Sequence, residues 1–257
     1  MGRLPTCLVI LTAALVLAAC QHAPPRNPMA EWVPSDNFDA RRAQVIVLHY
    51  TEQDSVAQSL RTLRTRNSGG RVSSHYLVGD DGRIYQLVAD DHRAWHAGAG
   101  SWGTINELNS ASIGIEIDND GAEPFTEPQV AALLRLLEDL TARHRIPKHA
   151  VIGHSDLAPG RKIDPGPRFP WKRLHDAGFG IWPDPAAPPP PPDFDPVQAL
   201  RLVGYPVDRL EATIQSYRMR FRGDNGTTLD DEDLRILHAL TWRRSPVSAS
   251  GEGAGAP

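Results

Sequence analysis

The chain has 257 residues, which is enough for one medium-sized domain and a smaller one. Its hydrophobic, charged and aromatic fractions, 40%, 23% and 7%, are typical of a soluble globular protein and exclude a fibrous or disordered one. The net charge of -4, without a basic run interleaved with aromatic residues, gives no reason to expect a nucleic-acid partner.

The first twenty residues differ in composition from the rest. Arg3 precedes an apolar stretch from Cys7 to Ala19 that is too short for a permanent membrane span, and small residues precede Cys20. We therefore expect residues 1–19 to be a signal peptide that is removed. Because Cys7 is lost with it, Cys20 is left as a single cysteine, and no internal disulfide can form.

The junction Leu17-Ala18-Ala19-Cys20 resembles the cleavage site of bacterial lipoproteins, which implies that Cys20 carries a lipid anchor. Gln21, where some lipoproteins have an aspartate, resembles those sorted to the outer membrane. The resemblance implies a lipoprotein on the periplasmic face of the outer membrane. The alternative is an ordinary signal peptide cut elsewhere.

Two proline-rich segments divide the chain. Residues 20–42 contain four prolines and few apolar residues, which indicates a tether. Residues 183–196 include five consecutive prolines, a composition that favours a semi-rigid polyproline II spacer. The expected remaining parts are a larger domain at 43–182, a small helical domain at 197–245 and a flexible tail at 246–257.

Strand-like and helical patterns alternate in the larger domain. The run from Val45 to His49 is almost continuously apolar, as in a strand that is buried on both faces. Thr126 and Gln129 form a capping box before leucines that recur at helical spacing. Further strands are expected at 74–78, 83–88, 112–118 and 150–153, and a further helix at 54–66. The pattern predicts an α/β fold with a mixed central sheet flanked by helices.

Three short helices are predicted after the spacer, which gives a small three-helix domain. Each begins with an aspartate that can cap its first turn, and each carries apolar residues at helical spacing. The three run from Asp195 to Gly204, from Asp208 to Phe221 and from Asp230 to Leu240.

Three residues form a candidate metal site. His49 ends one strand-like run, His154 follows another, and Asp164 lies on the Gly/Pro-shaped loop beyond it. Two neutral imidazoles and one carboxylate would leave a tetrahedral zinc ion one open position, which a hydrolase needs. Asp156 is a rival carboxylate, but its position two residues after His154 is more typical of a cap or turn residue.

Glu116 interrupts an apolar strand, where alternation places it on the face opposite Ile113, Ile115 and Ile117. If it points toward the metal, its carboxylate could take a proton from the attacking water and pass it to the leaving amine. Lys162 lies two residues before Asp164, so its ammonium could stabilise an oxyanion. The alternatives are that Glu116 is a structural carboxylate and that Lys162 is a solvated loop cation.

Five segments in one order carry a family resemblance: 47–51, 72–78, 94–98, 112–116 and 153–166. From about Gln44 to about Leu174 the chain resembles the zinc-dependent N-acetylmuramoyl-L-alanine amidases, a family that includes phage-type amidases and peptidoglycan recognition proteins. The resemblance implies zinc held by His49, His154 and Asp164, with Glu116 and Lys162 catalytic.

Other residues in these segments are weaker candidates. His75, Trp95 and His96 are candidates for binding glycan or stem peptide, although His75 is equally typical of a buried structural histidine. Some phage-type members carry a catalytic tyrosine at the position of Ser74, and its task would pass here to Glu116.

The resemblance implies a zinc enzyme that hydrolyses the amide bond between N-acetylmuramic acid and the L-alanine of the peptidoglycan stem peptide; the anhydro form of the sugar stays open as a substrate. One alternative is a recognition module that binds muropeptide without cleaving it, but such relatives lack zinc ligands that this chain keeps. The other is a zinc peptidase acting within the stem, although no His-Glu-x-x-His helix is present.

The apolar pattern at 197–245 resembles the small three-helix peptidoglycan-binding domain, and the alternative is a helical appendage that packs on the larger domain. We expect a monomer whose partners are peptidoglycan or muropeptide fragments, and the membrane through Cys20.

Overall fold

The computed structural model describes residues 26–40, 43–65 and 70–242. The expected signal peptide, the lipidated Cys20 and the expected tail at 246–257 therefore lie outside the described residues. Within the described ranges, the structure has no helix that is both long and apolar enough to cross a membrane.

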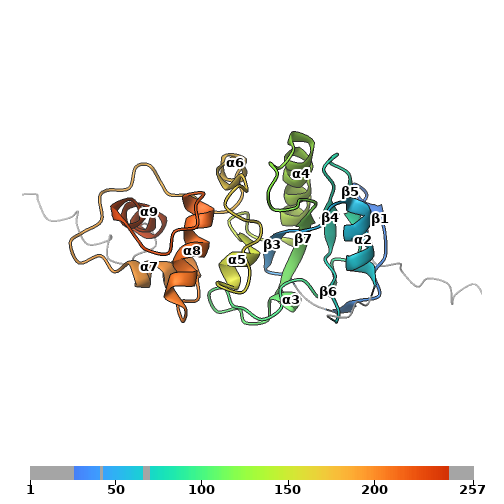
Figure 1. Ribbon diagram of the computed structural model, residues 1–257, viewed down its shortest axis with the longest axis horizontal. Helices are drawn as coiled ribbons and strands as arrows, with labels where there is room; N and C mark the ends of the chain where they lie inside the picture. Colours follow the sequence, from blue (N-terminus) through green and yellow to red (C-terminus); the bar gives the residue numbers. More distant parts are fainter. Residues whose placement is uncertain (1–25, 41–42, 66–69, 243–257) are drawn as a thin grey trace, which may run out of the picture.

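A mixed six-stranded sheet forms the centre of the molecule, as the sequence predicts (Figure 1). In spatial order, the six strands are β1 (Glu31–Trp32), β5 (Ile84–Gln86), β4 (Tyr76–Val78), β7 (Ser112–Ile117), β3 (Val45–Tyr50) and β8 (Val151–Gly153). Strands β4, β7, β3 and β8 are parallel to one another, whereas β5 is antiparallel to β4. A separate two-stranded sheet pairs β2 (Phe38–Ala40) with β6 (His92–Ala94).

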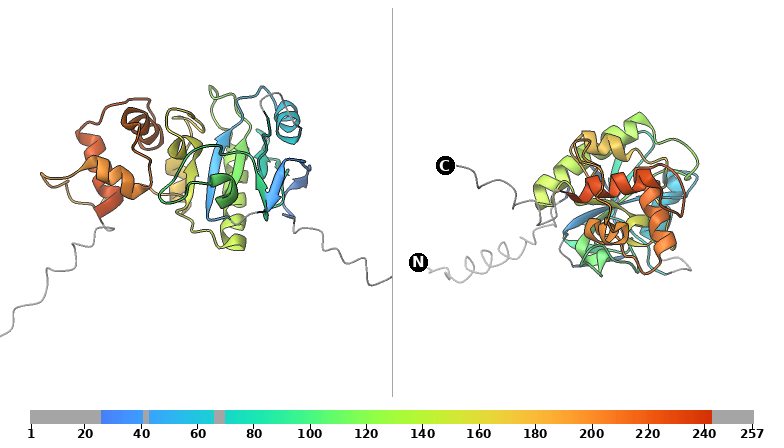
Figure 2. Two further views of the ribbon diagram at one scale, coloured as in Figure 1. Left: turned by 90° about the horizontal axis from the view of Figure 1, so that it is seen from below. Right: turned by 90° about the vertical axis from the view of Figure 1, so that its left-hand side faces the viewer.

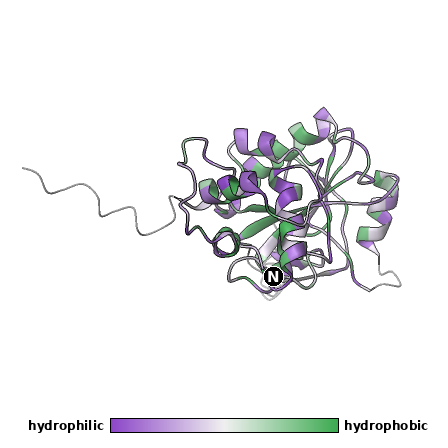
Figure 3. Ribbon diagram, turned by 60° about the vertical axis from the view of Figure 1, so that its left-hand side comes forward, coloured by the Kyte–Doolittle hydropathy of each residue, from purple (hydrophilic) through white to green (hydrophobic). Residues whose placement is uncertain are grey.

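Helix α4 (Glu127–His144) covers one face of the sheet. The predicted capping box is confirmed, because the Thr126 hydroxyl accepts from the Gln129 N–H and the Gln129 side chain accepts from the Thr126 N–H. Its buried leucines pack on the isoleucines of β7, where each such side chain contributes about 1.5–3 kcal/mol of hydrophobic stabilisation. Apolar residues accordingly concentrate on the central strands and polar residues on the outer helical surfaces (Figure 3).

Shorter helices cover the other face. Leu63 of α2 (Val56–Arg64) packs with Leu77, and α3 (Leu108–Ala111) and α5 (His154–Leu157) pack on β3 and β8. Helix α6 (Trp171–Asp176) joins the core on the α4 side. The sheet therefore has both faces covered, which explains the continuous apolar run of β3.

The expectation of a tether over residues 20–42 is wrong for the described residues from Asn27 onward. Strand β1 pairs with β5, and the Val33 N–H donates to the Gln86 carbonyl at 2.8 Å. The buried Asn27 donates its backbone N–H to Gln86 Oε1 at 2.9 Å. The sheet would otherwise end at β5 with unpaired backbone groups, so this segment completes its edge. Two paired residues are too few to give a period-two pattern in the sequence.

Helices α7 (Pro196–Val203), α8 (Leu210–Phe221) and α9 (Asp231–Thr241) form a small core of their own, here called the helical unit. Asp195 and Asp230 cap α7 and α9 as predicted. The predicted cap at Asp208 is wrong: Asp208 and Arg209 form a turn, and α8 begins at Leu210 without a side-chain cap. The helical unit lies at one end of the molecule beside α5 (Figures 1 and 2).

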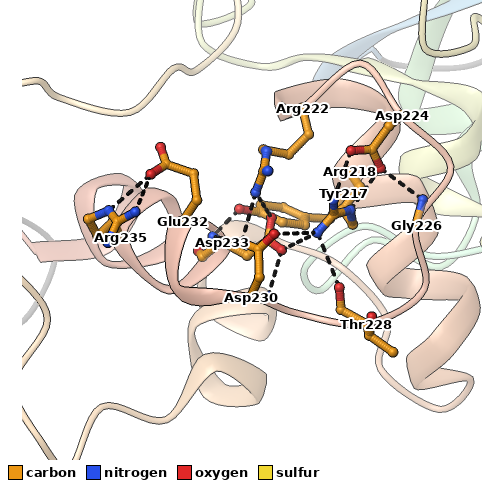
Figure 4. A network of polar contacts seen from close by, with 10 residues as sticks. All are labelled: Tyr217, Arg218, Arg222, Asp224, Gly226, Thr228, Asp230, Glu232, Asp233 and Arg235. Carbon is orange, nitrogen blue, oxygen red and sulfur yellow. Dashed lines mark hydrogen bonds and ion pairs between the residues drawn. The ribbon is translucent and has the colours of Figure 1, made fainter.

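An ionic network joins α8 to α9 (Figure 4). Arg222 contacts Asp230 at 2.9 Å and the fully buried Asp233 at 3.0 Å, and Arg218 also pairs with Asp233. Because removing one partner would leave a buried charge unpaired, this network stabilises the helical unit from within.

Candidate metal centre

Three neighbouring parallel strands bring the predicted site residues together. His49 of β3 is in register with Glu116 of β7, and Leu48 is in register with Gly153, the last residue of β8. His154 follows Gly153 directly. The site therefore lies at the carboxyl ends of adjacent parallel strands, where α/β sheets commonly bind ligands.

The three predicted metal ligands converge on one point. His49 Nδ1 lies 2.9 Å from His154 Nδ1 and 3.0 Å from Asp164 Oδ2, and His154 Nδ1 lies 2.9 Å from Asp164 Oδ2. All three residues are buried. A triangle of this size lets one ion lie at the bond lengths of about 2.0–2.2 Å that zinc forms with imidazole and carboxylate ligands.

The hydrogen bond of His154 on its far side fixes the tautomer. Its Nε2 lies 2.8 Å from the carbonyl oxygen of Ala97, which can only accept, so Nε2 carries the proton. In the neutral ring, Nδ1 then presents a lone pair to the cluster.

A longer chain of hydrogen bonds fixes His49. The Ser112 hydroxyl donates to the Leu108 carbonyl, so its oxygen accepts from His96 Nε2 at 3.2 Å. His96 Nδ1 is then an acceptor for His49 Nε2, which lies 3.0 Å away. This relay leaves His49 Nδ1 as a lone pair directed at the cluster.

The electrostatics of the cluster fit a bound cation. Burial, together with the neighbouring His154, lowers the pKa of His49 to about 4, so its ring is neutral near pH 7. Two bare nitrogens and a carboxylate oxygen within 3.0 Å of one another repel unless a positive ion lies between them. The donor set suits zinc.

The cluster lies in a cavity of about 410 Å³, a volume within the usual range for ligand sites. Glu116 and Lys162 both line it. Ile113, Ile115 and Ile117 point into the core on the opposite face, as the alternation of β7 predicts. Other lining residues are Tyr50, Thr51, Glu52, Gln53, Ser59, Thr62, Leu63, Val72, His96, Arg161 and Ile163.

Glu116 has the properties of a group that exchanges protons with a ligand. Its Oε2 is buried and has no hydrogen-bond partner among the described residues. Burial, together with the charge of Asp164, raises the pKa of this carboxyl well above its ordinary value, and Lys162 acts in the opposite direction. A raised pKa in a cavity-lining carboxyl is typical of groups that take up and release protons in catalysis.

The weaker candidates have different positions. His75 is fully buried; its Nε2 donates to the His92 carbonyl and its Nδ1 accepts from the Gly114 N–H, both at 3.0 Å. Trp95 lies beneath the Arg93 guanidinium, 4.0 Å from the ring centre. Neither lines the cavity within the described chain, so substrate contact by these two stays a prediction.

Two further predicted residues can also be placed. The Ser74 hydroxyl donates to the Tyr76 carbonyl at 2.6 Å and is fully buried. Asp156 accepts from the Gly153 N–H at 2.8 Å, which confirms its interpretation as a cap residue in place of a ligand.

Sequence reasoning missed the residues behind the ligands. The Asn109 side chain accepts from the backbone N–H groups of His96 and Ala97, and so holds the partners of both histidine ligands. Gly114 leaves room for the His96 ring, because a Cβ there would lie 2.4 Å from it. The segment 94–98 contains His96 and Ala97, but nothing in its spacing indicates contact with His49 and His154.

The sequence profile of the N-acetylmuramoyl-L-alanine amidases (Amidase_2) matches residues 39–167, and the chain belongs to this family. The amidase AmiD of Escherichia coli is 43% identical over 159 residues, which cover 56% of each chain. The 1,6-anhydro-N-acetylmuramyl-L-alanine amidase AmpD of Enterobacter cloacae is 39% identical over 104 residues, 40% of this chain and 56% of AmpD. The matched region thus spans little more than half the length of these relatives.

Solved structures extend the similarity over more of the chain. AmiD of E. coli, in complex with anhydro-N-acetylmuramic acid-L-Ala-D-γ-Glu-L-Lys, superimposes with a TM-score of 0.69 at 34% identity, covering 85% of this chain and 93% of AmiD. AmpDh3 of Pseudomonas aeruginosa, in complex with an anhydromuramic pentapeptide, gives 0.70 at 32% identity, covering 88% and 97%. Both comparisons cover more than residues 39–167 alone.

Proposed function

We propose that this protein is a zinc-dependent amidase that hydrolyses the bond between N-acetylmuramic acid and the L-alanine of the peptidoglycan stem peptide. The observation that carries the proposal is the convergence of three ligand atoms in one cavity with Glu116, whose Oε2 has no hydrogen-bond partner in the part of the chain that the structure describes. When bound by His49, His154 and Asp164, zinc would polarise the scissile carbonyl and acidify a water molecule.

The remaining steps belong to side chains of the chain. Glu116 would accept a proton from the attacking water and return it to the leaving nitrogen, and its raised pKa suits both transfers. The Lys162 ammonium would stabilise the negative charge that develops on the carbonyl oxygen. The Ser74 hydroxyl donates to the Tyr76 carbonyl and does not line the cavity, so the task of the tyrosine of some relatives would pass to Glu116.

Anhydro-muropeptides are the substrates we propose first. Both solved relatives named above were captured with an anhydromuramic peptide, and they share about a third of their residues with this chain. A peptidoglycan-recognition module without catalysis is less consistent with the site, since all three ligands are present and converge.

The mass of the products tests this function. The purified protein should release a peptide beginning with L-alanine from a small anhydro-muropeptide, and leave an intact anhydro-sugar. Products cut between two stem residues would instead identify a peptidase, and binding without any product would identify a recognition module.

We also propose that Cys20 anchors the protein to the outer membrane, on its periplasmic face. The motif before Cys20 supports this, and stable anchoring needs more than one acyl chain. The Cys20→Ala variant should leave the membrane fraction; its retention there after a salt wash would contradict lipidation.

Wall binding by residues 197–245 stays a prediction. It can be tested by sedimenting the full-length Glu116→Gln variant with intact sacculi while excess soluble muropeptide occupies the catalytic cavity. Binding that persists would indicate a second site, whereas complete release would contradict one.

A further inference from the structure

A buried ion pair joins the helical unit to the turn that carries His154. Arg220 Nη1 of α8 lies 2.5 Å from Asp156 Oδ2 of α5, and the Arg220 Nη2 donates to the Val151 carbonyl of β8 at 3.1 Å. Arg220 is 3% exposed and Asp156 is 1% exposed. The pair is therefore enclosed between the two parts of the molecule, where an unpaired charge would be costly.

A second donor from the helical unit binds the other oxygen of the Asp156 carboxylate. The Tyr205 hydroxyl donates to Asp156 Oδ1 at 2.6 Å, and Tyr205 is also buried. The remaining contact is local, from the Gly153 N–H to Asp156 Oδ2 at 2.8 Å. Among the described residues, two of the three donors to this carboxylate thus come from outside the larger domain.

The turn held by Asp156 contains one metal ligand and contacts another. His154 is the first residue of α5, two positions before Asp156. The Ser155 N–H between them donates to the backbone carbonyl of Asp164 at 2.8 Å. A displacement of Asp156 would therefore move the backbone of both His154 and Asp164.

The interface around Asp156 is close-packed, so a displacement of the helical unit would also displace the larger-domain residues that it contacts. A Cβ on Gly204 would lie 2.6 Å from the ring of Trp102, and the Gly103 N–H donates to the Gly204 carbonyl at 2.8 Å. The Arg220 guanidinium lies 4.2 Å from the centre of the Trp171 ring, within the main core. Helix α8 accordingly lies directly beside α5 (Figure 1).

We propose that the helical unit is a positioning partner of the metal centre: Arg220 and Tyr205 hold Asp156, and through it the turn that presents His154. This inference rests on the metal site of the proposed function. It gives the three helices a role in the metal centre that is independent of any binding to the cell wall.

The test compares zinc affinity among full-length variants by competition with a chelator, together with kcat and KM on an anhydro-muropeptide. Arg220→Met keeps much of the apolar stem and removes the charge, so zinc affinity should fall by about tenfold or more, with kcat affected more than KM. Tyr205→Phe, which removes a single hydrogen bond, should cause a smaller loss in the same direction. Arg222→Met is the matched control, since Arg222 pairs with Asp230 and Asp233 inside the helical unit.

Unchanged zinc affinity in folded Arg220→Met and Tyr205→Phe would overturn the proposal. If Arg220→Met does not fold, the Tyr205→Phe result decides alone. An equal loss in Arg222→Met would also overturn it, because the effect would then be general destabilisation. Failure of the wild-type protein to give an amidase product would refute the proposed function, while the zinc comparison would still test the coupling.

Discussion

The imidazole of His96 lies directly behind that of His49, with 3.0 Å between His96 Nδ1 and His49 Nε2. His96 in turn contacts Ser112, so a residue at the start of β7 determines which nitrogen of a metal ligand is free to bind. The outer partners of metal-binding histidines commonly fix the ring in this way.

Removal of the Ser112 hydroxyl should loosen this relay. In Ser112→Ala, His96 loses its acceptor and can adopt the other tautomer, so zinc affinity should fall by about 10–100-fold. Ser35→Ala is the matched control, because Ser35 is also buried and also donates to a backbone carbonyl, that of Leu63. Chelator competition measures both variants, and equal affinities would show that the relay does not set the tautomer.

Glu116→Gln should separate catalysis from metal binding. The amide keeps the shape of the side chain but cannot accept the proton, so kcat should fall by about 10²–10⁴ while zinc content is retained. The measurement is turnover of an anhydro-muropeptide alongside zinc analysis. Near-normal turnover in the fully loaded variant would return Glu116 to a structural role.

Lys162→Met should lower turnover without loss of zinc. An oxyanion donor is worth about 10²–10³ in kcat, and Lys162 lines the cavity without being one of the three predicted ligands. Lys148→Met is the control, since Lys148 pairs with Glu138 on the surface. If both variants retain wild-type turnover, Lys162 is a solvated loop cation.

Asp90 should make a pH-dependent contribution to the stability of the fold. Its buried carboxylate accepts from Tyr76 Oη at 2.7 Å and Arg143 Nη1 at 2.6 Å, and it also contacts His144. Burial acts to raise its pKa, but these three partners outweigh it and lower the pKa below the usual 3.8. The carboxylate therefore stabilises the folded state above that pH, and the contribution is lost as the pH falls through the lowered pKa.

Urea unfolding of wild type and Asp90→Asn at several pH values measures this contribution. The difference in the free energy of unfolding should be about 1.5–3 kcal/mol near pH 7 and should shrink as the pH falls below about 4. Zinc release at low pH affects both proteins and cancels in the difference. A difference that stays constant with pH would contradict the role of the Asp90 charge.

The sequence predicts the sheet and the ligands well because both leave strong local signals. The apolar run before His49 and the capping box at Thr126 each depend on a few neighbouring residues, and both are confirmed. The convergence of His49 and His154 follows once both end adjacent parallel strands. Strand β1 leaves no such signal, since its two residues are held by the exposed edge of β5.

The sequence alone left two alternatives for the helical unit, a wall-binding domain and an appendage that packs on the larger domain. The proline run predicts a spacer between separate domains. The ion pair between Arg220 and Asp156 joins positions 64 residues apart, and neither residue carries a local pattern that reveals it. The structure shows Tyr205 and Arg220 of the helical unit bonded to Asp156 of the larger domain, and the role of this contact at the metal centre is our proposal.

Metal analysis of the ligand variants tests the central claim most directly. The purified wild-type protein should bind one zinc ion and lose its amidase activity when a chelator removes it, and added zinc should restore both. His49→Ala, His154→Ala and Asp164→Ala should each lose zinc and activity together, whereas Asp176→Asn, a surface carboxylate paired with Lys172, should lose neither. An Asp164→Ala variant that keeps stoichiometric zinc and near-normal turnover would contradict the account.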